Sequence, residues 1–237
     1  MVVVNTTRNG RPDSAQVGAA QTGAAQVGAA LVGALSAANA SARLKAALRA
    51  GTDPDPQLVE ILVGRCAVEG DFFVRDMLTW ALCRMPVDIT VPRLLGELRS
   101  GGAQARSQAL HTLSKIGDLR AWPDVVTQLH DRDDDVARSA WRAAVALVPP
   151  GAEGDLAADL ATALGRGDRE LQRSLSRALI GLGESVLPVL DAAKASSDAK
   201  IRAHAEATEA LYRDPDSAFA LSVETAKRVA VTGPEGS

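Results

Sequence analysis

Residues 71–78 read Asp71-Phe-Phe-Val74-Arg75-Asp-Met-Leu78. An acidic residue that can cap a helix opens this stretch, and the apolar Val74 and Leu78 follow four residues apart. That spacing places both side chains on one face of an α-helix. The stretch therefore predicts an amphipathic helix that begins after Asp71 and buries one face.

The same pattern occurs five times along the chain. The openers follow one another at intervals of 31, 31, 35 and 30 residues: Asp71, Gly102, Asp133, Asp168 and Asp198. Two apolar positions follow each opener at the same spacing: Val74/Leu78, Ala105/Ala109, Val136/Ala140, Leu171/Leu175 and Ile201/Ala205. A shorter helical pattern precedes each opener, and no segment reads as a strand. Because one helix pair cannot bury its apolar face alone, five pairs predict a stacked, all-α solenoid.

Both ends of the repeat carry a further helical pattern. Ser41 lies one repeat before Asp71 and precedes Leu44 and Leu48, and a second pattern begins at Asp216. We therefore expect one extra helix at each end, a solenoid domain over residues 37–231 and a disordered tail over 232–237. The interval of 35 residues predicts an insertion near 149–151, at Pro-Pro-Gly.

A more conspicuous repeat, AQVGA-AQTGA-AQVGA-ALVGA, runs from Ala15 to Ala34. A period of five gives neither a helix nor a strand a consistent apolar face. About twenty residues are too few for a β-helical solenoid, and the three glutamines do not suit a membrane anchor. We therefore expect residues 1–36 to form a disordered or weakly helical arm, whose last residues, 31–35, could join the first helix. Deleting 1–36 should then leave the fold intact.

Composition excludes several classes of function. The net charge is −3, which does not favour a globally basic nucleic-acid-binding protein. Cys66 and Cys83 lie inside helical patterns and are expected to be reduced, buried side chains of a cytoplasmic protein. The three histidines lack metal-ligand spacing, so we expect no metal site, no cofactor and no catalytic group.

The repeated motif D-x-x-V-R-x-x-[LA] resembles the HEAT-repeat family. It is clearest in residues 71–78 and in Ala105-Arg106-Ser-Gln-Ala109, and its period is similar to the short repeats of the phycobilisome-lyase type. The resemblance covers roughly residues 53–213. It implies a right-handed, armadillo-type α-solenoid of about five HEAT-like pairs, in which the second helices line a concave surface. Ala137 and Gln172 stand where the motif has arginine.

Side chains two and six residues beyond the first core position point away from the core, about 200° and 240° around the helix. The non-alanine residues at these positions are Asp76, Trp80, Ser107, His111, Arg138, Arg142, Arg173 and Arg177. The four arginines would form a square that matches carboxylates or phosphates, with Trp80 as an apolar anchor. Alternatively, these arginines are only solvated and pair with Asp134, Asp135 or Glu170. Arg75, Arg106 and Arg202 point sideways and are expected to tie neighbouring repeats together.

These features predict a non-enzymatic, monomeric binding or scaffold module that grips a partner protein or peptide on its concave face. A membrane partner is not expected. The alternative is a nucleic-acid-binding protein, such as a HEAT-like protein that excises alkylated bases, or a relative of the bilin lyases. Asp76 and Trp80, one turn apart, would suit base excision, but the acidic net charge does not.

Overall fold

The repeated openers set where the second helix of each pair begins. In the computed structural model, which describes residues 28–214, all five openers are N-cap residues. The Asp71 carboxylate accepts the N–H of Val74, and the Asp168 carboxylate accepts that of Leu171. The first turn of a helix leaves these N–H groups without a partner in the helix, so the aspartates satisfy them.

The elements follow the predicted order, with a first helical segment and a second helix in each repeat. The second helices are α4 (Phe72–Leu82), α6 (Ala103–Ile116), α8 (Asp134–Leu147), α10 (Arg169–Ile180) and α12 (Ala199–Arg213). The elements that precede them are η1 (Pro56–Leu58) with α3 (Val59–Val68), α5 (Val87–Ser100), η2 (Leu119–Ala121) with α7 (Trp122–Val126), α9 (Glu153–Ala161), and η3 (Gly183–Val186) with α11 (Leu187–Lys194). The additional helix α2 (Ala40–Thr52) lies before them. Residues 28–214 contain no strand, which confirms the all-α class.

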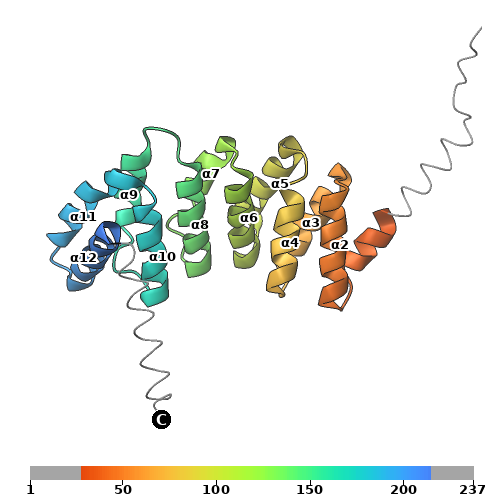
Figure 1. Cartoon of the computed structure of the whole chain (residues 1–237), viewed down its shortest axis with the longest axis horizontal. Helices are drawn as coiled ribbons and strands as arrows, with labels where there is room; N and C mark the ends of the chain where they lie inside the picture. The colour runs from red at the N-terminus through yellow and green to blue at the C-terminus, as the bar shows by residue number, and fades with distance from the viewer. Residues whose placement is uncertain (1–27, 215–237) are drawn as a thin grey trace, which may run out of the picture.

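The pairs stack into one row, in the order of the sequence. Figure 1 shows α2, α4, α6, α8 and α10 side by side, so that the second helices form one face of the row. The predicted core positions of these helices are buried, except that Ile201 is half-buried in the last pair. The core is continuous from Leu35 to Ala205, as expected when each unit covers its neighbour.

A helix lies before the predicted boundary at residue 36. Residues 28–35 form a helix, and Leu35 is fully buried in the core. The fourth five-residue word differs from the others because Leu31 replaces glutamine, which gives the i, i+4 apolar pair Leu31/Leu35. Residues 31–35 were expected to be able to join a helix, and the helix starts three residues earlier, at residue 28. Residues 1–27, the helix expected from Asp216 and the tail at 232–237 lie outside the described residues.

The remaining local predictions have mixed outcomes. A turn at residues 149–151 separates α8 from α9 at the predicted insertion, and Gly151 has a φ of 89°, which favours glycine. Cys66 is buried, and burial raises the pKa of its thiol to about 12. Cys83 is exposed, contrary to the prediction, because α4 ends there and Cys83 is its C-cap.

Within residues 28–214, no helix combines the length and the apolar character needed to cross a membrane.

Candidate partner-binding groove

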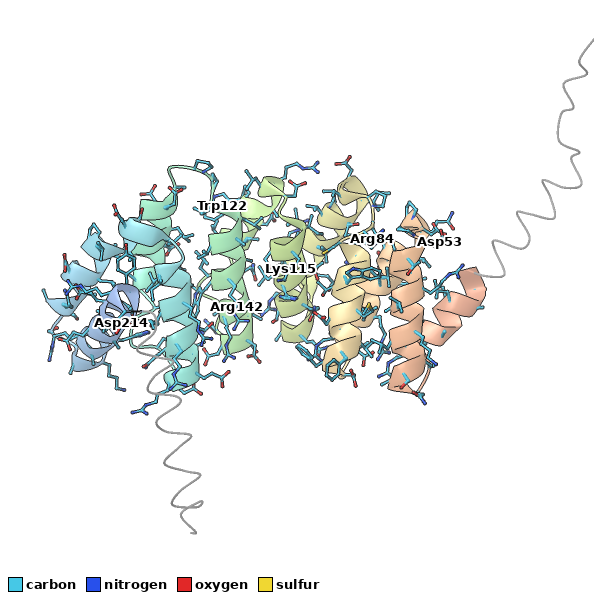
Figure 2. All side chains as sticks on the ribbon, viewed as in Figure 1. Asp53, Arg84, Lys115, Trp122, Arg142 and Asp214 are labelled. Carbon is cyan, nitrogen blue, oxygen red and sulfur yellow. The ribbon has the colours of Figure 1, made fainter. Side chains whose placement is uncertain are left out.

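A groove of about 480 Å³ crosses the second helices α4, α6 and α8. Five of the eight predicted surface residues line it: Asp76, Ser107, His111, Arg138 and Arg142. Figure 2 shows Arg142 on α8 and Lys115 on α6, on the face that the second helices form. The helical spacing rule therefore brings residues from three repeats to one place.

Arg142 is the most electrostatically strained group of the groove. Its guanidinium donates one long hydrogen bond to Ser174 Oγ at 3.4 Å and has no ion pair within residues 28–214. Burial lowers its pKa, and the charges of Arg138 and Arg177 lower it further. Two of the other predicted arginines therefore lie close enough to repel Arg142, and the Glu170 carboxylate partly opposes their effect.

The other three arginines differ in their partners. Arg138 donates to Glu170 Oε1 at 3.1 Å and lies 3.9 Å from a carboxylate oxygen of Asp135. These contacts agree with the solvation alternative for Arg138. Arg173 and Arg177 are exposed beyond the groove on α10, and neither has a carboxylate partner in the described part of the chain.

His111 lies in the groove wall between charges of opposite sign. Burial is the main cause that lowers its pKa, and the nearby cations Lys115 and Arg142 act in the same direction. The Asp76 carboxylate on α4 partly opposes them. The imidazole is therefore neutral at pH 7 and offers the groove one donor and one acceptor.

Two predicted residues are engaged by neighbouring helices. Trp80 packs on α2, where a Cβ atom added to Gly51 would lie only 2.2 Å from its ring, and it does not line the groove. The Arg84 guanidinium covers the same ring at 5.4 Å from its centroid and donates to the Gly51 carbonyl. Ser107 lines the groove, but its hydroxyl is shared with that of Ser139 at 2.8 Å. Trp80 therefore lies away from the site at which it was expected to anchor a partner.

The three sideways arginines bind loop carbonyls. Arg75 Nη1 donates to the carbonyls of Glu69 and Gly70 at 2.8 and 2.9 Å. Arg202 makes the equivalent pair of bonds to residues 196 and 197. Arg106 binds the Gly101 carbonyl and also reaches Asp131 of the next repeat at 3.0 Å. Only Arg106 therefore reaches a neighbouring repeat, whereas Arg75 and Arg202 bind the loop inside their own repeat.

Sequence reasoning missed the acid that completes this arrangement. The Glu69 carboxylate is fully buried and accepts from Arg43 at 2.6 and 2.7 Å and from Arg65 at 2.9 Å. Hydrogen bonding to Arg43 is the largest of the causes that lower its pKa to about 2. Glu69 and Asp131 each lie two residues before an opener and accept its backbone N–H. An acidic residue two positions before an opener is therefore the sequence signal that could have identified Glu69.

The third repeat, one of two that lack the motif arginine, has a substitute. Ala137 leaves the carbonyls of Asp131 and Arg132 without their usual donor, and Arg166 Nη2 of the next repeat donates to them at 2.7 and 3.3 Å. The same guanidinium pairs with Asp134 at 2.7 Å. Arg166 occupies the position two residues before its opener, which is acidic in Glu69 and Asp131.

The described residues hold no group of three or more His, Cys, Asp or Glu side chains placed to bind a metal ion. His204 is instead part of a buried, neutral network. Its Nδ1 accepts the N–H of Gly165 at 3.0 Å, and its Nε2 lies 3.0 Å from the Gln172 carbonyl. Because a carbonyl only accepts, the proton is on Nε2.

No protein-family model and no curated protein sequence matches the chain. A designed armadillo repeat protein is similar in structure, with 14% identity over 75% of this chain and 96% of that chain, at a TM-score of 0.39. The complex of CpcE and CpcF of phycocyanin lyase from Nostoc sp. PCC7120 is similar over 86% of this chain and 79% of that one, with 17% identity and a TM-score of 0.45. An engineered protein has 19% identity over 78% of this chain and 95% of its own, with a TM-score of 0.43. Similarity at this level carries no information about what the chain binds.

Proposed function

We propose that this protein is a non-enzymatic binding module that holds an acidic segment of a partner protein across its second helices. The segment would lie along the groove between α4 and α8 and continue toward α10. Its carboxylates would contact Arg142 and Arg177, with Arg173 nearby on the same helix.

One observation carries this proposal: two arginines of this face, Arg142 and Arg177, lie near other cations and form no ion pair with a described residue. Arg142 and Arg177 have no carboxylate partner among residues 28–214, although the charges of Arg138 and Arg177 lower the pKa of Arg142. Bringing cations together raises the free energy of the unbound protein, and an anion between them would relieve that cost. A guanidinium also binds carboxylates in a fixed, two-pronged geometry.

The groove is less suited to the phosphate backbone of a duplex. Asp76, Asp133 and Asp135 line the same groove, and their carboxylates would repel closely spaced phosphates. A peptide can instead alternate acidic and basic side chains to match them. These carboxylates favour a protein partner over the nucleic-acid alternative.

Affinity capture from the native cells, with quantification of each captured protein, tests the proposal. The double variant Arg142→Ser/Arg177→Ser removes the two arginines, and we expect it to lose the partner that the wild-type chain retains. Its melting temperature should be unchanged or slightly higher, because a repulsion disappears with the guanidinium groups.

The matched control is Arg132→Ser/Arg169→Ser. Both arginines are exposed and lie outside the groove, so the control changes the net charge by the same amount. Equal retention by both variants would refute the assignment to this face. Salt-sensitive binding of the wild-type chain to random duplex DNA at micromolar concentration would support the alternative function.

A further inference from the structure

Two aromatic side chains stand exposed at the edge of the groove. Phe72 and Phe73 open α4, are 64% and 70% exposed, and contact each other edge to face with centroids 5.6 Å apart. The chain has only three phenylalanines, so two of them stand together in water. An exposed apolar cluster of this kind is typical of an interaction site.

The cluster is continuous with the groove. Phe72 is part of the groove wall, together with Arg138 and Arg142. The groove therefore has an apolar end at the start of α4. Its cationic end on α8 holds Arg138 and Arg142, beside Asp133 and Asp135 and next to the exposed arginines of α10. A single partner segment that lies across the helices would meet both ends in turn.

We infer that Phe72 and Phe73 bind a bulky apolar side chain of the same partner segment, next to its acidic residues. This inference rests on the proposed function and adds the second element of recognition. Aromatic side chains lose little conformational entropy on binding and often dominate the affinity of an interface, whereas exposed charges mainly set its orientation. The cationic end selects an acidic partner, and the aromatic end fixes its register.

Selection from a displayed random-peptide library tests the inference without knowledge of the natural partner. Peptides that bind the wild-type chain should combine a bulky apolar residue with acidic residues on one side of it. The variant Phe72→Ser/Phe73→Ser should weaken the selected peptides about tenfold or more, the loss expected of a hot spot. Its melting temperature should not change, because both side chains are exposed.

The control Ile89→Ser/Leu119→Ser removes two apolar side chains of comparable exposure, 47% and 52%, which do not line the groove. It should change the affinity by less than about twofold. Acidic peptides with no apolar consensus, bound equally by the phenylalanine variant, would overturn the inference and leave the proposed function standing. A wild-type chain that selects no peptides would overturn both. If the wild-type chain binds phosphatidylcholine–phosphatidylserine vesicles and the phenylalanine variant does not, while both bind the peptides equally, the phenylalanines contact a lipid surface and the inference is overturned.

Discussion

At two junctions between neighbouring units, an arginine donates to two loop carbonyls, but it crosses the junction in opposite directions along the chain. At the N-terminal junction, Arg43 of α2 binds the carbonyls of residues 37 and 38 and reaches forward to the buried Glu69. Between the third and fourth repeats, Arg166 reaches backward to the equivalent carbonyls and pairs with Asp134. In both places, one guanidinium satisfies two loop carbonyls and crosses to a neighbouring unit.

The difference between them lies in burial. The Glu69 side chain is fully buried and that of Arg43 is 11% exposed, whereas Arg166 and Asp134 are 27% and 53% exposed. A buried charge depends on its partner much more than an exposed one. Both junctions supply a donor to the loop carbonyls. Because only the first ion pair is buried, only the stability of the first junction depends strongly on its ion pair.

Removing the Glu69 carboxylate should have the largest effect on stability. Glu69→Ala leaves Arg43 and Arg65 without their shared counter-ion, and breaking a buried ion pair costs about 3–5 kcal/mol. Urea unfolding followed by circular dichroism measures this loss. The exposed pair offers a control, since Asp134→Ala should cost below about 1 kcal/mol. Similar losses for both variants would contradict the role of burial.

The pH dependence of stability isolates the same carboxylate. The pKa of Glu69 is lowered from 4.5 to about 2 in the folded protein, so the unfolded state binds the proton more readily. Its contribution is therefore complete above about pH 4.5 and is lost as the pH falls toward 2. The variant Glu69→Gln should show a flatter stability profile than the wild type across that interval.

A double-mutant cycle at the second junction should show an intermediate effect. Arg166→Met removes the donor from two loop carbonyls and should cost about 1–2 kcal/mol. Ala137→Arg alone should also destabilise, because Ala137 is fully buried and Arg166 already occupies the carbonyls. Combined, the two changes should cost less than their sum, since the new arginine replaces the lost donor. Additive losses in urea unfolding would mean that the two positions are not equivalent.

The openers and core positions could be predicted because they depend only on spacing within one helix. Five of the eight predicted surface residues reach one groove for the same reason. Trp80 could not be placed, because its contact with Gly51 depends on which neighbouring helix its side chain meets. Arg166 was missed because it compensates for Ala137 from the next repeat, at a position that the motif does not include.

A smaller, pH-dependent effect is expected at the last junction, where residues 28–214 form no ion pair at the equivalent place. His204 Nδ1 accepts the backbone N–H of Gly165. Protonation of Nδ1 would turn it into a second donor that faces this N–H, and the hydrogen bond would be lost. Burial is the main cause that lowers the pKa of His204 from 6.5. Below pH 6.5 the unfolded chain takes up the proton first, so stability should fall as the pH decreases. His204→Gln should reduce that slope between pH 7.5 and 5 in thermal unfolding, and an unchanged slope would exclude His204 as its source.

The smallest effect should follow deletion of residues 1–27, which leaves the first junction untouched. Arg43 binds carbonyls beyond the deleted segment, and Leu35 remains in the core. We expect the unfolding free energy to change by less than about 0.5 kcal/mol, because these contacts of the first junction all remain. Deleting 1–36 instead removes the buried Leu35 and should cost about 2–3 kcal/mol. Equal unfolding free energies of the two truncated chains would show that the helix at 28–35 does not stabilise the first junction. The contacts of Arg43 with the loop carbonyls and with Glu69 would then be sufficient to stabilise it.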